Sequence, residues 1–186
     1  MILGHTFSSI LVGRKNPELL KRRATFGEGT KTWDYVILTI FGLTFLVTLA
    51  IAAFDAGKRW SEMSSWIWWV FGVVLFSFYL VTITWSMVVN PHFEKTVRIQ
   101  SDRDHKVIDT GPYRFVRHPG YTGIIVGFIL SAPFLLGSWW ALVPAFVSVA
   151  SLVVRTVLED RVLHAELTGY EEYAQRVRYR LIPGIW

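Results

Sequence analysis

Long stretches without charge alternate with short basic segments along this chain of 186 residues. Two of the stretches, residues 35–54 and 63–91, are each long enough for one helix across a bilayer, which needs about 20 predominantly apolar residues. A third stretch covers residues 119–154 and is longer than one span requires. The pattern therefore predicts an integral membrane protein.

The third stretch has the features of two helices. Pro133, Gly137 and Pro144 interrupt it, and both residue types disfavour a continuous helix. A helical hairpin that turns near residues 136–138 fits this pattern best. We therefore predict an all-α integral membrane protein with about four transmembrane helices, of which the last two form the hairpin.

Length and composition favour one domain. Hydrophobic residues make up 52% of the sequence, which leaves room for a single compact helical domain, residues 1–186. Within it we distinguish an N-terminal segment (1–32), two transmembrane helices (33–90) and a second half (91–186). The sequence contains no cysteine, which excludes disulfides, thiolate metal sites and cysteine nucleophiles. No metal site is predicted.

The basic residues predict the topology. Of 19 lysines and arginines, all but two fall between Arg14 and Lys31, between Lys95 and Arg117, or between Arg155 and Arg180. Only Lys58 and Arg59 remain for the other side of the membrane. The positive-inside rule then places all three basic segments in the cytoplasm. The net charge of +5 reflects this topology and an attraction to anionic membrane lipids, and we do not predict nucleic acid as a partner.

Segments beside the spans carry interfacial signals. Residues 16–20, Asn-Pro-Glu-Leu-Leu, open a basic amphipathic helix that we expect at the membrane surface before Trp33 anchors the first span. After the hairpin, residues 155–179 keep apolar positions among polar ones. The last helix is therefore predicted to leave the membrane and enter the cytoplasm.

The polar segment between the second and third spans, residues 90–119, is long for a connector with little predicted secondary structure, which suggests function. It runs into Gly-Pro-Tyr-Arg-Phe-Val-Arg-His-Pro-Gly-Tyr, residues 111–121. His118 precedes Pro119 and is thereby held away from helical geometry, so its ring should project from the mouth of the next helix. A lone histidine is more often an ordinary interfacial residue, but in this cluster we expect it to contact a ligand.

Charged residues at the far end of the hairpin are candidates for the same site. Arg155, Glu159 and Asp160 lie about one helical turn apart and share a face of the last span. Two interpretations stay open: a solvated helix end with an ion pair, or the second half of a ligand site.

The order of these motifs is similar to that of the isoprenylcysteine carboxyl methyltransferase family, whose relatives include integral-membrane phospholipid methyltransferases. The resemblance rests on residues 111–121, an uncharged hairpin, Glu159-Asp160, residues 169–173 and residues 181–183. It covers roughly the second half of the chain, from Phe93 onward. The family usually has two glutamates where this chain has Glu159 and Asp160, and either carboxylate can accept hydrogen bonds.

The resemblance implies a methyltransferase that uses S-adenosylmethionine without a Rossmann domain, with residues 91–186 as its cofactor-binding catalytic half. The sequence agrees, since it has no glycine-rich loop between a strand and a helix. Carried over by position, the cofactor pocket would comprise Gln100, His105, Val107, Gly111, Tyr113, His118, Pro119 and Tyr121, with Glu159 and Asp160 closing it. The cofactor carries a sulfonium, an amino group, a carboxylate and hydroxyls, so carboxylates, aromatic faces and cationic donors are needed together.

The acceptor decides which side chains take part in the reaction. A carboxylate is already ionised near neutral pH, so Arg117 or Arg155 need only orient it. An amine must first lose a proton, for which His118, Glu159 or a water would be the base. The sequence names no dedicated base. We therefore favour carboxyl O-methylation of an isoprenylcysteine-like substrate, a lipophilic or prenylated acceptor that enters from the bilayer.

Three alternatives stay open: a phospholipid amine N-methyltransferase, a non-catalytic membrane protein, and a nicotinamide-dependent enzyme like the sterol reductases. Against a transporter, the spans hold no central ionisable residue of the kind that transport pathways show. Against a reductase, the chain is short and has no second phosphate-binding cluster.

Overall fold

The structure, a computed structural model, describes residues 2–58, 60–61, 63 and 65–186. Arg59, one of the two cations expected on the far side of the membrane, lies outside these residues. The described residues form helices and loops without a β-strand. In chain order the elements are α1 (Ile2–Lys15), α2 (Pro17–Arg22), α3 (Thr32–Lys58), α4 (Trp66–Val89), the 3₁₀ turns η1 (Ser101–Arg103) and η2 (Gly111–Arg114), α5 (Pro119–Thr122), the π-helical stretch η3 (Gly123–Ile129), α6 (Leu130–Leu136), α7 (Leu142–Glu166) and α8 (Tyr170–Arg176).

Four helical runs among the described residues are long and apolar enough to cross a membrane: α3, α4, the continuous run α5–η3–α6, and α7. This confirms the all-α integral membrane fold. The hairpin between α6 and α7 turns at Gly137, within the predicted residues 136–138. Its φ of 70° is a left-handed conformation that glycine adopts at little cost. Pro133 lies inside α6 without ending that helix.

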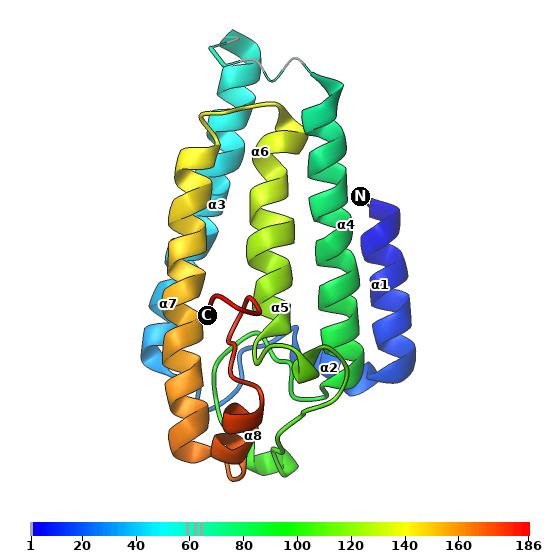
Figure 1. Ribbon diagram of the computed structural model, residues 1–186, viewed down its shortest axis with the longest axis vertical. Coiled ribbons are helices and arrows are strands. Elements are labelled where there is room, and N and C mark those ends of the chain that lie inside the picture. Colours follow the sequence, from blue (N-terminus) through cyan, green and yellow to red (C-terminus); the bar gives the residue numbers. More distant parts are fainter. Residues whose placement is uncertain (1, 59, 62, 64) are drawn as a thin grey trace.

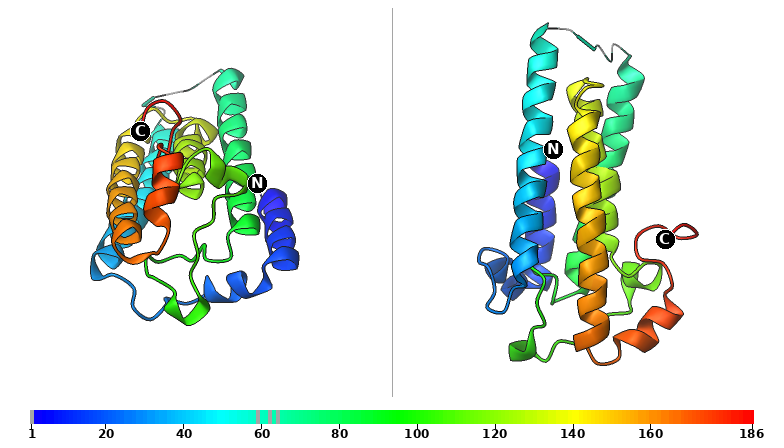
Figure 2. Two further views of the ribbon diagram at one scale, coloured as in Figure 1. Left: turned by 60° about the horizontal axis from the view of Figure 1, so that its bottom comes forward. Right: turned by 90° about the vertical axis from the view of Figure 1, so that its left-hand side faces the viewer.

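The run α5–η3–α6 lies at the centre of the bundle, with α3 and α7 on one side and α4 on the other (Figures 1 and 2). Helix α3 packs against α7 and α6, whereas α4 packs against α1, η3 and α6. Glycine allows α4 to come close: a Cβ on Gly127 would lie 2.6 Å from the backbone nitrogen of Tyr79, and one on Gly123 would lie 3.1 Å from the Cβ of Thr82. Helices α3 and α4 therefore lie on different sides of the hairpin.

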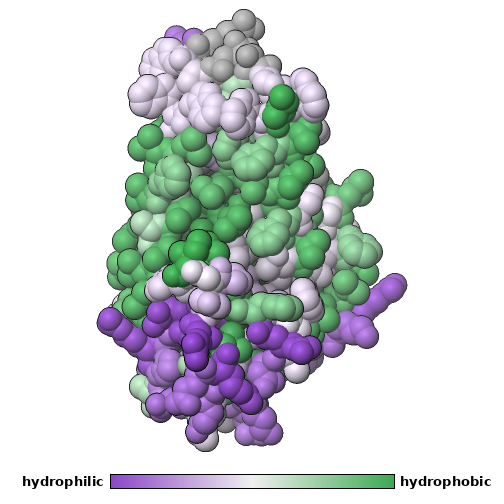
Figure 3. Space-filling model, viewed as in Figure 1, coloured by the Kyte–Doolittle hydropathy of each residue, from purple (hydrophilic) through white to green (hydrophobic). Residues whose placement is uncertain are grey.

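Hydrophilic residues gather at one end of the molecule, and the middle is hydrophobic (Figure 3). Helices α2 and α8 and the loop between α4 and α5 lie at this end, which we call the basic end (Figure 1). The other end, called the opposite end, carries exposed indoles from Trp60, Trp66 and Trp140. Tryptophan prefers the headgroup level of a bilayer, so the two ends mark the two membrane surfaces.

The N-terminal segment contains two helices. Helix α2 crosses the basic end, as expected for a surface helix, but α1, which the sequence did not predict, runs lengthwise beside α4 (Figures 1 and 2). The hydroxyls of Ser8 and Thr84 lie 2.6 Å apart. The Asn16 side chain donates hydrogen bonds to the carbonyls of Met87 and Val88, at 2.7 and 2.8 Å. These bonds fix the N-terminal segment to the end of α4.

Residues 155–179, predicted to extend the last span out of the membrane, form two helices. Helix α7 continues to Glu166, and Gly169, with a φ of 81°, turns the chain into α8. The chain after α8 then returns to the bundle (Figure 1). A single glycine thus folds the C-terminal part of the chain back over the basic end.

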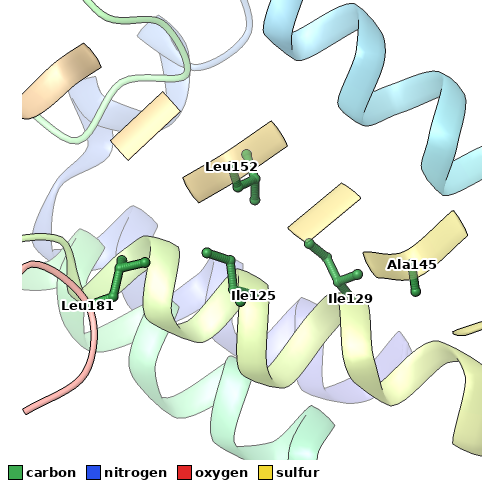
Figure 4. Close-up of a cluster of buried hydrophobic side chains, with 5 residues drawn as sticks. All are labelled: Ile125, Ile129, Ala145, Leu152 and Leu181. Atoms are coloured by element: carbon green, nitrogen blue, oxygen red, sulfur yellow. The ribbon is translucent and has the colours of Figure 1, made fainter. Parts of the chain in front are cut away.

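The C-terminal segment closes the core of the hairpin. Leu181 belongs to one hydrophobic cluster with Ile125 and Ile129 of η3 and with Ala145 and Leu152 of α7, and it lies at the end of the cluster next to Ile125 (Figure 4). All five side chains are buried. The residues after α8 are therefore anchored beside the start of α5, where the segment 111–121 ends.

Candidate functional site

A pocket lies at the basic end. Its walls come from the loop between α4 and α5, from the start of α5, from the end of α7 and from α8. An apolar patch of Val107, Ile108, Leu163 and Leu167 forms part of the lining. The rest consists mainly of aromatic, amide, imidazole and charged side chains.

Asp160, on α7, joins three other segments beside the pocket. Arg117 donates to its two carboxylate oxygens through Nε at 2.9 Å and Nη2 at 3.0 Å. Arg180 and the Tyr170 hydroxyl each donate at 2.8 Å, and Nε2 of His118 lies 3.1 Å away. Only 1% of Asp160 is exposed. Since these bonds are charge-assisted, they hold the loop, α8 and the C-terminal segment tightly to α7.

The backbone of the same loop is held by the C-terminal segment. The amide of Arg117 donates to the carbonyl of Tyr179, and that of His118 to the carbonyl of Arg180, both at 2.9 Å. Nη1 of Arg117 donates to two further carbonyls of this segment at 2.8 Å. His118 is non-helical, with φ −123° and ψ 61°, as its place before a proline predicts. Its ring is thus fixed from both the backbone and the side chain.

Glu159 lies in the pocket lining, next to the stacked rings of Tyr121 and His118. It accepts a hydrogen bond from the hydroxyl of Tyr121. The Tyr121 ring is stacked beside the ring of His118, with centroids 5.8 Å apart, and the guanidinium carbon of Arg155 lies 5.2 Å from its centre. A carboxylate and two aromatic faces are therefore presented together.

Arg155 lies behind Tyr121, outside the pocket lining. It donates to Asp34 through Nε at 2.6 Å and Nη2 at 3.0 Å, and to the carbonyl of Lys95 at 2.6 Å. Asp34 is fully buried and also accepts from the amide of Val97 at 2.8 Å. This pair ties the start of α3 to α7 and to the loop that forms the pocket.

A further wall is built from loop residues around Gln100. The rings of His92 and His105 lie 4.5 Å apart. The side-chain amide of Gln100 donates to the carbonyl of His92 at 2.8 Å, and the backbone N–H of Gln100 donates to Nδ1 of His105 at 3.3 Å. Burial lowers the pKa of His92. Burial also lowers the pKa of His105 to about 4, and the charges of Arg98 and of His92 in its protonated form act in the same direction. Both rings are neutral near pH 7.

Three tyrosines complete the pocket. The Tyr173 hydroxyl donates to the carbonyl of Tyr113 at 2.8 Å, and the side chain of Asn90 donates to the Tyr113 hydroxyl at 3.0 Å. Tyr170 bonds Asp160, as described above. Burial raises the pKa of all three phenols, so they stay protonated. Tyr170 and Tyr173 donate hydrogen bonds through their hydroxyls, whereas the Tyr113 hydroxyl accepts one. In the part of the chain that the structure describes, no group of three or more histidine, aspartate or glutamate side chains is arranged to hold a metal ion.

Most of the residues suggested by the resemblance lie at this pocket. Those in its lining are Gln100, His105, Val107, Tyr113, Arg117, His118, Tyr121 and Glu159. Gly111, Pro119 and Asp160 lie next to the lining, and Arg155 lies behind it. Gly111 has a φ of 57°, and a Cβ there would lie 2.9 Å from the side chain of Val89, so the loop needs glycine at this turn.

Several residues of the site were missed by the sequence analysis. In the lining these are Asn90, His92, Phe93, Tyr170 and Tyr173, and Asp34 and Arg180 support it from outside. A usable signal existed for Asp34. It directly precedes the first uncharged stretch and Arg155 directly follows the third, so the topology places opposite charges at the same membrane surface, where a buried pair would be expected.

Comparison with known proteins identifies a matching family model and two similar proteins. The model of the Isoprenylcysteine carboxyl methyltransferase (ICMT) family matches residues 70–165, which is more than half of the chain. Two curated proteins, from Oryza sativa subsp. indica and Oryza sativa subsp. japonica, carry the name probable protein-S-isoprenylcysteine O-methyltransferase. Each is 32% identical over 92 residues, which is 46% of this chain and 45% of the relative. The match thus spans about half the length of these relatives. The chain belongs to the isoprenylcysteine carboxyl methyltransferase family.

Proposed function

We propose that this protein transfers a methyl group from S-adenosylmethionine to a lipophilic acceptor at the cytoplasmic face of the membrane. The observation that carries this proposal is the pocket at the basic end, in which Glu159, Tyr121 and His118 converge in a member of this family. The acceptor that we favour is a carboxyl group of an isoprenylcysteine-like molecule. The names of the two rice relatives support this choice of acceptor.

The donor set of the pocket fits S-adenosylmethionine. Glu159 and the ring of Tyr121 offer the negative charge and the aromatic face that a sulfonium or an ammonium group needs. The apolar patch around Leu163 and Leu167 suits an adenine ring, while Gln100 and the neutral His105 supply donors and acceptors for hydroxyls and a carboxylate. Each chemical part of the cofactor thus has a matching group in the lining.

The residues of the chain would act by positioning. When bound, S-adenosylmethionine supplies the methyl group: its bond to sulfur breaks as the bond to the acceptor oxygen forms, the electron pair stays on sulfur, and a carboxylate acceptor loses no proton. Such an in-line displacement needs alignment and exclusion of water more than a general base. Asp160, Arg117 and the C-terminal segment hold His118 in place, and Tyr121 fixes the direction of Glu159.

The distribution of charge supports the proposed membrane orientation. Helix α2, the α4–α5 loop and α8 bring the basic segments to the end that holds the pocket (Figures 1 and 3). Basic segments favour the cytoplasmic side during insertion. A lipophilic acceptor could then keep its tail in the bilayer while its reactive head reaches the pocket from the side.

Binding of the demethylated product, S-adenosylhomocysteine, tests the proposal. Protein in nanodiscs should bind it with a dissociation constant in the micromolar range, as is typical for enzyme substrates. Glu159→Gln should weaken this binding about tenfold, because a charge-assisted contact is lost. Isothermal titration calorimetry measures both values.

Glu166→Gln is the matched control, since this carboxylate lies on the same helix but pairs with Lys31 at the surface. It should leave binding unchanged. The absence of any heat or thermal shift with either S-adenosylmethionine or its product would reject the proposed function. Radiolabelled methyl transferred to a native lipid extract separates the acceptors, because an ester is base-labile and a methylamine is not.

A further inference from the structure

The segment after α8 changes character at residue 181. Residues 176–180 contain three arginines, whereas residues 181–186, Leu-Ile-Pro-Gly-Ile-Trp, carry no charged side chain. We call residues 181–186 the apolar loop. None of them lines the pocket at the basic end. The site described above therefore does not account for their composition.

The backbone of the apolar loop closes on itself. The backbone oxygen of Trp186 accepts hydrogen bonds, at 2.9, 3.0 and 3.3 Å, from the amides of Arg180, Leu181 and Ile182. The carbonyl of Ile182 accepts from the amides of Ile185 and Trp186, at 3.1 and 3.2 Å. Amides that are bonded within the loop need no water, which is a condition for placing backbone among acyl chains.

One side of the apolar loop is fixed to the bundle. Leu181 is buried in the hydrophobic cluster of η3 and α7 (Figure 4), and Trp186 packs against the same cluster. The carbonyl of Leu181 accepts from the hydroxyl of Thr122 at 2.7 Å. The guanidinium carbon of Arg180, which is bonded to Asp160, lies 5.2 Å from the centre of the Trp186 ring. Protein contacts on this side therefore fix the position of the loop.

The other side of the apolar loop is exposed. Ile185 leaves 78% of its surface uncovered, and Ile182 leaves 39%. Pro183 and Gly184, which lie between them in the sequence, are exposed as well. Removing such a contiguous apolar surface from water is favourable. The exposed side therefore indicates an apolar partner.

The apolar loop is level with the uncharged part of the spans. Leu181 lies next to Ile125 of η3 (Figure 4) and shares a hydrophobic cluster with Leu152 of α7. The first charged residue of α7 is Arg155, which follows Leu152 on the way to the basic end. After α8 the chain turns away from the basic end, and the loop lies beside the spans, nearer to the middle of the molecule than α8 (Figures 1 and 2). At this depth the surface of the spans faces acyl chains.

The residues before the apolar loop suit the headgroup level. The side chain of Arg178 is exposed at the basic end, where a cation is attracted to anionic headgroups. Tyr179 is 39% exposed, and tyrosine prefers the boundary between water and acyl chains. Arg180, which follows, is paired with Asp160. Along the chain, an exposed cation and an interfacial aromatic residue thus precede the apolar turn, in the order of the layers that a segment meets as it enters a leaflet.

We propose that the apolar loop is inserted into the leaflet at the basic end, where Ile182 and Ile185 bind the acyl chains of membrane lipids. The chain then re-enters the membrane after α8 without crossing it. This anchor goes beyond the proposed function, because its partner is a lipid surface and neither the cofactor nor the methyl acceptor. Lipid is favoured over a second copy of the chain, because the loop lies in the apolar belt that the bilayer already covers.

The anchor acts on the site through the residues that precede it. The carbonyls of Tyr179 and Arg180 accept hydrogen bonds from the amides of Arg117 and His118. A loop that is held in the leaflet keeps these carbonyls in place. Lipid contact therefore supports the position of the His118 ring from outside the pocket.

Cysteine labelling of the full chain tests the anchor. The sequence has no cysteine, so Ile185→Cys supplies a single thiol. In nanodiscs that hold one copy, a membrane-impermeant maleimide should label it at least about tenfold more slowly than Glu171→Cys, because a thiol among acyl chains stays protonated and away from the reagent. Glu171 lies on α8 and is exposed. A nitroxide on Ile185→Cys should collide more often with oxygen than with a water-soluble nickel chelate, and on Glu171→Cys the order should reverse. Ile182→Cys, as a second position, should behave like Ile185→Cys.

The protein itself leaves Ile185 mostly exposed, so protection of the thiol has to come from lipid or from a second copy. Labelling of Ile185→Cys as fast as that of Glu171→Cys would overturn the anchor. Protection that is found only in nanodiscs with two copies would assign the loop to an interface between copies, and would overturn the lipid partner.

Ligand binding tests the link to the site. Ile185→Asp places a carboxylate among acyl chains, which is costly, so the loop should leave the leaflet and the affinity for S-adenosylhomocysteine should fall severalfold. Ile185→Leu is the matched control and should bind like the wild type. Equal affinities for Ile185→Asp and Ile185→Leu would overturn the link between the anchor and the site. Failure of the wild-type protein to bind S-adenosylhomocysteine would instead reject the proposed function, and the labelling rates would still decide whether the loop lies in the leaflet.

Discussion

Asp160 at the basic end and Asp55 at the opposite end are both buried, with 1% and 2% of their surface exposed. Asp55 accepts hydrogen bonds from the amide and hydroxyl of Ser61 and from the hydroxyl of Ser138. Asp160 accepts from the guanidinium groups of Arg117 and Arg180, as well as from a phenol. One carboxylate is satisfied by neutral donors and the other mainly by cations.

The difference separates two uses of a buried charge. The bonds of Asp55 join the loop after α3 to the turn between α6 and α7, so they fasten the ends of the spans. The bonds of Asp160 join three segments whose other side chains line the pocket. At the basic end, the charges that stabilise the fold also fix the groups of the site, and the two roles cannot be changed independently.

Removing the carboxylate at the basic end should have the largest effect. Asp160→Ala leaves Arg117 and Arg180 near each other without a counter-ion, and breaking a buried pair in this way costs about 3–5 kcal/mol. We expect a large fall in the melting temperature in detergent and loss of S-adenosylhomocysteine binding. Thermal unfolding and calorimetry measure the two effects.

Asp160→Asn is the milder companion variant, since the amide oxygen can still accept one bond. Its melting temperature should lie between those of the wild type and Asp160→Ala. If Asp160→Ala melted at the wild-type temperature, the hydrogen bonds of this carboxylate would not be what holds the loop, α8 and the C-terminal segment to α7.

The same change at the opposite end should cost less and leave the site intact. Asp55→Ala leaves two hydroxyls and one backbone amide without their acceptor. Removing the partner of a neutral group lowers the free energy of unfolding less than removing the partner of a charged group. We expect a smaller fall in melting temperature than for Asp160→Ala, with unchanged affinity for S-adenosylhomocysteine. A loss of ligand affinity here would mean that the two ends are coupled through the hairpin.

Much of the fold could be predicted from the sequence, because membrane spans and their connections are local signals. The hairpin turn at Gly137 follows from residue type and spacing alone. Helix α1 was missed because its position depends on contacts with α4, such as that between Ser8 and Thr84, which lie far apart in the sequence. The turn at Gly169 was missed because a single glycine has many possible roles.

For the candidate site, the residues of one contiguous motif were easier to foresee than their partners. His118 stands before a proline and within a cluster, so its exclusion from the helix could be predicted. For Arg155, the topology indicates Asp34 as a possible partner at the same membrane surface, but the sequence alone does not choose between Asp34 and the carboxylates that follow Arg155 on α7. Glu159 and Asp160 lie four and five residues after Arg155, about one helical turn away, and only tertiary packing decides which carboxylate each arginine contacts.

The weakest expected effect concerns pH. Burial lowers the pKa of His105 to about 4, below its ordinary value of about 6.5. As the pH falls through about 6.5, the unfolded chain binds a proton at this residue while the folded protein does not, so the folded state loses stability on the way down to about pH 4. Above about pH 6.5 the contribution is complete. His105→Asn should therefore flatten the decline in melting temperature between about pH 7 and pH 5, whereas His5→Asn on α1 should not. If the melting temperature fell equally with pH in the wild type and in His105→Asn, His105 would be accessible to water in the folded protein. The contrast between the basic end, where buried groups form the site, and the opposite end, where they join the spans, would then be weaker.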